Sequence, residues 1–101
     1  MDRGKFEQFI VIALIGSASA ERYKRRNSDL TAWGIGSLID RAKTYCDSAW
    51  NLCSESNFTT CVLFAELIGS AGFDRDLHRD DYLSLFDRAE RLAHLEGQKK
   101  E

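Results

Sequence analysis

Two short charged segments contain the side chains best suited to bind another molecule. In the first, residues 21–27, basic side chains surround a tyrosine: Arg22, Tyr23, Lys24, Arg25 and Arg26. Cations that bind phosphate, next to a ring that can stack on a base, are typical of nucleic-acid-binding surfaces. The same cations would suit an acidic protein surface, or simply the solvated C-terminal end of a helix, where they favour the helix dipole. Runs this short are common on protein surfaces, so we prefer the solvated helix end.

The second segment, residues 74–81, alternates acidic with basic side chains. Its acids at positions one, three and seven match the beginning of a calcium-binding loop. The match then fails, because such a loop has glycine at position six and glutamate at position twelve, where this chain has Arg79 and Leu85. The sequence therefore predicts a charged surface connector, in which Asp74 and Asp76 are candidates for contact with a partner.

Neither catalysis nor a bound metal is indicated by any motif. Cys46, Cys53 and Cys61 lack the closely spaced pairs that are usual in zinc sites. An odd number of cysteines leaves one unpaired in a secreted monomer, so we expect three reduced, mostly buried thiols in a cytoplasmic protein. The sequence contains no GxSxG elbow, glycine-rich phosphate loop or HExxH motif. It therefore predicts a protein that is not an enzyme and needs no cofactor.

Length and composition fit one helical domain over residues 1–101. The chain is 44% hydrophobic and 30% charged and has no proline, a profile typical of globular helical proteins. A net charge of −2 argues against bulk coating of nucleic acid. No apolar run reaches the roughly 18 to 20 residues of a membrane-spanning helix. The N-terminus has a weak signal-peptide pattern, but Asp2 and Glu7 in its basic region argue against one.

Four helices must position these side chains. Apolar residues at helical spacing predict them over residues 4–20, 30–53, 57–69 and 79–96. The last has acids in its first turn and Gly97 as a glycine just past its end. Segment 57–69 also contains strand formers, but it has no second strand to pair with, so we predict a helix. Short connectors favour antiparallel neighbours, and the predicted fold is an all-α four-helix bundle.

Repetition within the chain suggests how the bundle is built. Residues 14–18 and 67–71 both read Leu-Ile-Gly-Ser-Ala, and residues 37–42 and 84–89 differ at one apolar position. This order predicts two related helical hairpins, although two independent uses of a good packing phrase would look the same. Gly16, four residues before Ala20, predicts a point of close helix approach.

The repeated Asp-Arg pairs allow a hypothesis about register, in which Asp40 meets Arg88 and Asp87 meets Arg41 across the bundle. Apolar positions on the four helical faces give the predicted core. It comprises Phe9, Ile10, Ala13, Leu38, Ile39, Ala42, Cys46, Trp50, Val62, Ala65, Ile68, Leu85, Phe86, Ala89 and Leu92.

We interpret the chain as a small protein-interaction module, such as an inhibitor, an immunity-type protein or a regulatory protein. Exposed aromatic side chains would anchor a protein partner, and the candidates are Tyr23, Trp33 and Phe73. The alternative is a nucleic-acid-binding regulator that uses the basic residues 22–26. Helix 4–20 is apolar on more than one side, which also predicts self-association as a homodimer.

Overall fold

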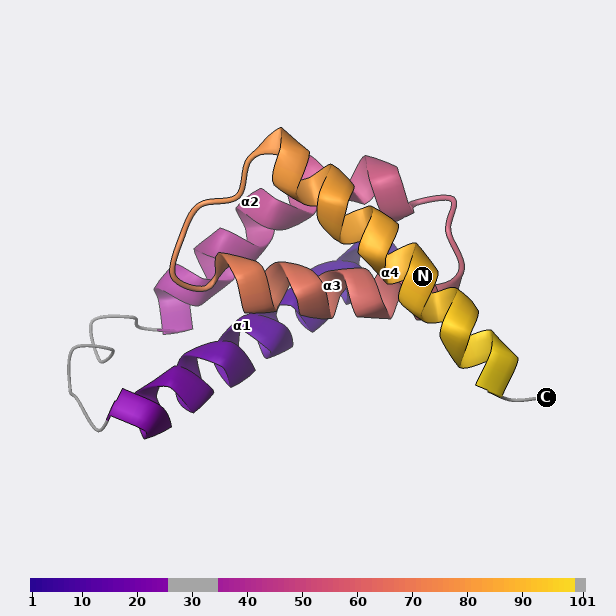
Figure 1. Ribbon diagram of the computed structural model, residues 1–101. Coiled ribbons are helices and arrows are strands. Elements are labelled where there is room, and N and C mark those ends of the chain that lie inside the picture. Colours follow the sequence, from indigo (N-terminus) through magenta and orange to yellow (C-terminus); the bar gives the residue numbers. More distant parts are fainter. Residues whose placement is uncertain (26–34, 100–101) are drawn as a thin grey trace.

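Four helices make up the part of the chain that the computed structural model describes (Figure 1). This part is the backbone of residues 1–25 and 35–99, with the side chains of residues 1–20 and 36–97. The helices are α1 (Arg3–Arg25), α2 (Ile35–Cys53), α3 (Phe58–Gly72) and α4 (Arg79–Lys99). The predicted all-α fold is confirmed, including a helix over 57–69. None of these helices is long and apolar enough to cross a membrane.

The helix ends refine the predicted boundaries. The predicted start of the second helix, at residue 30, lies outside the described residues. The first helix continues past residue 20 to Arg25, and α3 continues to Gly72. The prediction that Gly97 ends the last helix is wrong, because α4 runs on to Lys99 with the glycine inside it. A glycine without special backbone geometry costs a helix only about 1 kcal/mol, so it need not stop one.

Carboxylate and amide side chains begin three of the helices. Asp2 and Asn57 each accept a hydrogen bond from the main-chain N–H three residues later, both at 2.8 Å. In α4, Asp81 reaches back to the main-chain N–H of His78 at 2.9 Å. These bonds satisfy N–H groups that have no partner inside the helix, and they fix where each helix starts.

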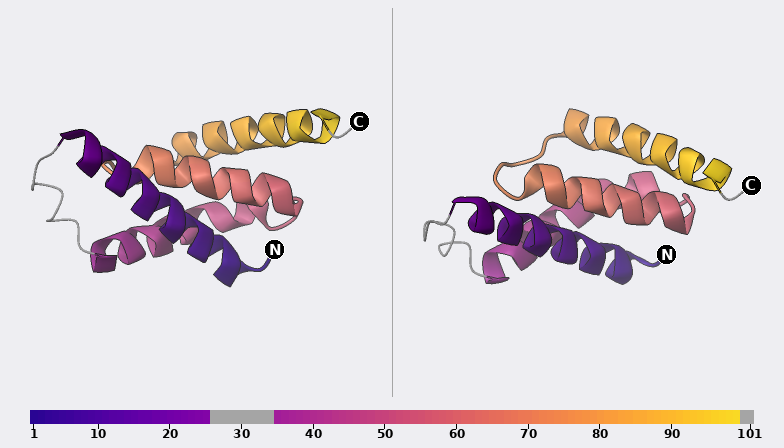
Figure 2. Two further views of the ribbon diagram at one scale, coloured as in Figure 1. Left: turned by 90° about the horizontal axis from the view of Figure 1, so that it is seen from below. Right: turned by 60° about the horizontal axis from the view of Figure 1, so that its bottom comes forward.

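The helices run in alternating directions, as expected for short connectors (Figures 1 and 2). The central helix is α3, which packs extensively against α1 on one side and α4 on the other, whereas the described backbones of α1 and α4 do not approach each other closely. The α2 helix packs mainly on α1 and makes only slight contact with α3 and with α4. The arrangement is therefore a four-helix bundle in which α2 is weakly packed against two of its neighbours, and the seam between α2 and α4 is one of these two places.

Apolar and aromatic side chains fill the interior between α1, α2 and α3. The ring of Phe6 lies 5.9 Å from that of Phe64 and 5.8 Å from that of Trp50. All fifteen predicted core residues except Ile39 are buried or half-buried; Ile39 is wrong, with 37% of its surface exposed. It follows Leu38 at the edge of the buried stripe of α2, where one residue turns the side chain by about 100°.

The three cysteines are free and buried, as predicted. The Cys61 thiol donates to the carbonyl of Cys53 at 3.1 Å, and both side chains lie at the junction of α2 and α3. Burial raises the pKa of the Cys53 thiol, and the adjacent Cys61 raises it further. The Cys53 thiol therefore stays protonated, and the three buried cysteines act as small core side chains.

The repeated phrase packs differently in its two copies. Leu14 and Ile68 are fully buried, but they occupy the first and second positions of the phrase respectively. The prediction of close approach at Gly16 is wrong: a β-carbon there would meet nothing within 4 Å. The close approach is at the equivalent Gly69, where a β-carbon would lie 2.3 Å from that of Ala13.

Candidate functional site

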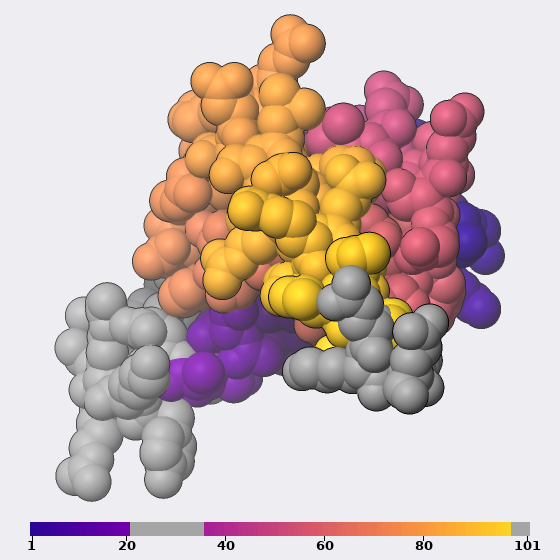
Figure 3. Space-filling model, turned by 45° about the vertical axis from the view of Figure 1, so that its right-hand side comes forward, coloured from indigo at the N-terminus to yellow at the C-terminus, as the bar shows by residue number. Residues whose placement is uncertain are grey.

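A groove runs between the end of α2 and the beginning of α4, with a volume of about 620 Å³. Figure 3 shows the side of the molecule that carries α4. The eight residues that line the groove are Ser48, Asn51, Leu52, Leu77, His78, Arg79, Tyr82 and Leu83. It lies at the weakly packed α2–α4 seam and is open to solvent.

Two buried side chains form the base of this groove. Leu77 has 9% of its surface exposed and Tyr82 has 5%. The ring of Tyr82 lies edge-on to that of Tyr45, with centroids 6.3 Å apart. Tyr82 also shares a hydrogen bond with Ser48 of α2, which holds the first turn of α4 against α2. The base is therefore a fixed part of the core.

Two leucines form the sides of the groove. Leu52 of α2 is half-buried, and Leu83 of α4 is 46% exposed. Leu83 lies outside the buried stripe of α4, and nothing in the described fold requires a large apolar side chain there. An apolar side chain that is exposed at the edge of a groove is available to a ligand.

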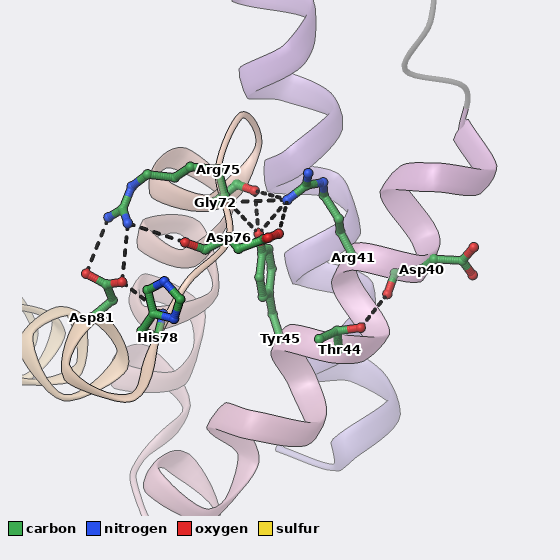
Figure 4. Close-up of polar contacts among 9 residues, drawn as sticks. All are labelled: Asp40, Arg41, Thr44, Tyr45, Gly72, Arg75, Asp76, His78 and Asp81. Carbon is green, nitrogen blue, oxygen red and sulfur yellow. Dashed lines mark hydrogen bonds and ion pairs between the residues drawn. The ribbon is translucent and has the colours of Figure 1, made fainter.

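The position of the groove depends on the connector between α3 and α4, which α2 holds in place (Figure 4). The Tyr45 hydroxyl donates to the carbonyls of Gly72 and Arg75, at 2.6 and 2.8 Å. The Arg41 guanidinium donates to the same two carbonyls at 3.3 and 3.2 Å, and to the Tyr45 hydroxyl at 2.9 Å. Asp76 pairs with Arg41 at 3.3 Å. These bonds satisfy the main chain of a turn that has no regular secondary structure.

Gly72 is required for this close approach. A β-carbon on this residue would lie 2.7 to 2.9 Å from three atoms of the Tyr45 ring and hydroxyl. The tyrosine is 3% exposed and cannot move outward without opening the core. Burial raises the pKa of Tyr45, so its hydroxyl stays protonated and remains a donor.

A second set of contacts holds the beginning of α4. The guanidinium of Arg75 donates to both carboxylate oxygens of Asp81, at 3.2 and 3.4 Å. The same carboxylate accepts the main-chain N–H of His78. The His78 N–H and Arg75 together lower the pKa of Asp81. The turn before α4 is thus fixed on both sides, and the lining residues that follow it have defined positions.

The groove lining offers apolar surface, hydrogen-bonding groups and positive charge. It contains no aspartate, glutamate, lysine or cysteine. Among the described residues, no group of three or more His, Cys, Asp or Glu side chains lies together as a metal site. Burial raises the pKa of Tyr82, so this hydroxyl too is a neutral hydrogen-bonding group. Such a lining is suited to binding.

The structure places some of the sequence candidates and leaves others untested. Arg22, Tyr23, Lys24 and Arg25 lie in the last turns of α1, with side chains outside the described part, and Arg26 and Trp33 lie entirely outside it. In the connector, Phe73 is half-buried against the core, Asp74 is exposed, and Asp76 pairs with Arg41. The connector candidates adjoin Leu77 and His78 of the groove lining.

The register hypothesis for the repeated Asp-Arg pairs is not supported. Arg41 reaches the α3–α4 connector and pairs with Asp76, while Asp87 pairs with Arg91 one turn along α4 at 3.0 Å. The two copies of the Asp-Arg pair, in residues 37–42 and 84–89, therefore face different neighbours.

Sequence reasoning missed the groove residues, although one signal was present. Leu83 and Leu95 break the polar face of an otherwise amphipathic helix, and both are exposed, at 46% and 52%. Leu95 lies in a second, shallower depression with Glu90, Arg91 and His94. On α1, Ile12 and Ile15 are also exposed, at 64% and 37%. Self-association through α1 stays a prediction, which light scattering can check.

Comparisons with protein-family models, curated proteins and solved structures find no match to this chain.

Proposed function

We propose that this protein is a non-enzymatic interaction module that binds a partner protein through the α2–α4 groove. The observation that carries the proposal is Leu83, a large apolar side chain exposed beside a groove with a fixed base. Protein interfaces combine an apolar centre with a polar rim, and here the leucines are bordered by Ser48, Asn51 and Arg79.

The size of the groove supports a protein segment as ligand. About 620 Å³ accommodates a few side chains, within the range of roughly 300 to 1,000 Å³ that is typical of binding pockets. One continuous segment of a partner would fill it, with flanking residues on the surrounding helices. The preorganised connector limits the entropy lost on binding.

A lining without an acid or an activated nucleophile supports binding over catalysis. The lining hydroxyls of Ser48 and Tyr82 are hydrogen-bonded to each other, and no lining carboxylate is available to orient His78 as a base. A nucleophile, a base and a group that orients the base are the minimum for most acyl-transfer sites.

A selection from a random peptide library displayed on phage tests the proposal. Peptides selected on the purified protein should lose affinity by about 30-fold for the Leu83→Glu variant, as at an interface hot spot. The matched control is Leu95→Glu, which changes an equally exposed leucine of α4 outside the groove and should alter affinity less than about twofold.

Two results would contradict the proposal. One is a selection that yields no peptide whose binding depends on Leu83. The other is an equal loss for both leucine variants, which would indicate non-specific adhesion to exposed apolar surface. Circular dichroism of both variants checks that the helices are retained.

The alternative partner is nucleic acid, bound by Arg22, Lys24, Arg25 and Arg26. It predicts binding to random duplex DNA that weakens steeply as salt rises. Absence of binding at low salt would remove this alternative.

A further inference from the structure

We infer that the segment bound in the α2–α4 groove is acidic: it carries a carboxylate side chain next to an apolar side chain the size of leucine. This inference rests on the proposed function and names the chemistry of the partner.

The charge of the groove lining favours an acidic ligand. The lining contains the permanently charged guanidinium of Arg79 and no carboxylate. The Arg79 side chain is exposed and forms no hydrogen bond or ion pair with any other residue in the part of the chain that the structure describes. A carboxylate on the ligand would give this guanidinium a bidentate partner.

Two acids near the groove already have partners. Asp81 pairs with Arg75 and accepts the N–H of His78. Asp47, on the last part of α2, pairs with Arg3. Asp80 follows Arg79 in the sequence, but it lies outside the lining, and adjacent helical residues diverge. The groove itself therefore presents positive charge, and an acidic ligand is complementary to it.

The spacing of Arg79 and Leu83 favours an acid next to an apolar side chain in the ligand. They are four residues apart in α4, so they lie one turn apart on one face, with Cβ atoms about 5 to 6 Å apart. Leu52 faces this pair from α2. A ligand with its carboxylate at Arg79 would therefore place an apolar side chain between the two leucines.

This spacing limits the ligand sequence. Side chains on one face of an extended segment are two residues apart, at about 6 to 7 Å, and on a helix they are three or four apart. The acid and the apolar residue should therefore be separated by one residue in an extended ligand, or by two or three in a helical one. The Asn51 amide and the Ser48 hydroxyl on the α2 side can hydrogen-bond the ligand main chain.

The test uses synthetic copies of the peptides that require Leu83, fluorescently labelled and titrated with protein. Changing the peptide's acid to its amide should lower affinity about tenfold, and Arg79→Glu should lower it at least as much. The matched control is Arg88→Glu, an exposed arginine of α4 outside the lining, which should change affinity less than about twofold. Replacing the peptide's acid by lysine should restore binding to the Arg79→Glu variant.

The outcomes separate this inference from the proposed function. Peptides that require Leu83 but lack acids, or that bind Arg79→Glu unchanged, would overturn the acidic ligand and leave the groove as a binding site. Failure to find any Leu83-dependent peptide would overturn both. Binding of a random DNA oligonucleotide that requires Arg79, without acidic peptides, would assign the groove to phosphate and overturn the inference. Because acids are favourable in the first turn of a helix, Arg79→Glu should fold normally.

Discussion

The α1–α3 crossing and the α2–α4 seam show two opposite ways in which neighbouring helices meet. At the crossing, Gly69 lies so close to Ala13 that a single added carbon would overlap its neighbours. At the seam, Leu52 and Leu83 face a groove of about 620 Å³ and contact between the helices is slight.

The difference follows from side-chain size at the point of contact. A glycine opposite an alanine lets two backbones approach until main-chain atoms touch, which leaves no space for a ligand. Where bulky residues with polar neighbours meet, as at the α2–α4 seam, the helices stay apart. Hydrogen bonds from Tyr45 and Arg41 to the carbonyl of Gly72 then hold the α3–α4 connector in place. The closely packed α1–α3 crossing contributes to stability, whereas the α2–α4 seam leaves an open groove.

The largest expected effect comes from disturbing the closed crossing. We expect Gly69→Ala to destabilise the protein by about 3 kcal/mol, because its β-carbon would lie 2.3 Å from that of Ala13 and close to main-chain atoms. Urea titration monitored by circular dichroism measures this change.

Gly16→Ala is the matched control, since it makes the same change in the same five-residue phrase. Nothing lies within 4 Å of its added carbon, so we expect a gain of up to about 1 kcal/mol from helix propensity. Equal effects at the two glycines would show that the crossing is not closed as described.

The next largest effect is expected from removing the hydrogen bonds by which Tyr45 holds the α3–α4 connector. Tyr45→Phe removes the hydroxyl that donates to the carbonyls of Gly72 and Arg75, and we expect a loss of about 1.5 kcal/mol in unfolding free energy. Arg41 still donates to both carbonyls, which limits the cost. Hydrogen exchange should show faster opening of the α3–α4 connector, whereas unchanged protection there would contradict the role of these hydrogen bonds.

Alkaline pH should lower the free energy of unfolding, and one of the groups responsible is Tyr82, at the base of the groove. Burial raises the pKa values of Tyr45, Tyr82, Cys46 and Cys53. Unfolded chains then lose these protons first, so stability is fully present below about pH 8.5 and declines as pH rises past the unfolded thiol and phenol pKa values.

Urea titrations at several pH values check this decline. The Tyr82→Phe variant should show a shallower decline above about pH 10, because one buried phenol no longer titrates. A stability that rises with pH in this range would refute the burial of these groups.

The smallest expected effect is on the stability of a groove variant. Leu83→Ser changes a side chain that is 46% exposed, and we expect the unfolding free energy to change by only about 0.5 kcal/mol or less. A loss of several kcal/mol would instead make Leu83 a structural residue and weaken its assignment to binding.

Sequence periodicity predicted the four helices and most of the core, because the buried face of a helix depends on the spacing of apolar residues along the chain. It failed at Ile39, which lies at the edge of the buried face, and at Gly97, a glycine that the helix runs through. Charge alone makes the connector acids Asp74 and Asp76 candidates for contact with a partner, and the structure pairs Asp76 with Arg41.

The groove was harder to predict, because its residues come from separate parts of the chain. Ser48 and Leu52 are distant in sequence from Arg79 and Leu83, and no local pattern links them. The exposed Leu83 was the one visible signal, as an apolar residue on a polar helical face.

By itself, the sequence determined the helices, their alternating directions and the burial of the cysteines, since these depend on local periodicity, short connectors and side-chain polarity. Tertiary structure decided which of two identical glycine phrases closes a crossing and which seam stays open. The reason is physical: Gly16 and Gly69 have the same local sequence, and only the side chains that other helices bring opposite them make one a contact and leave the other exposed.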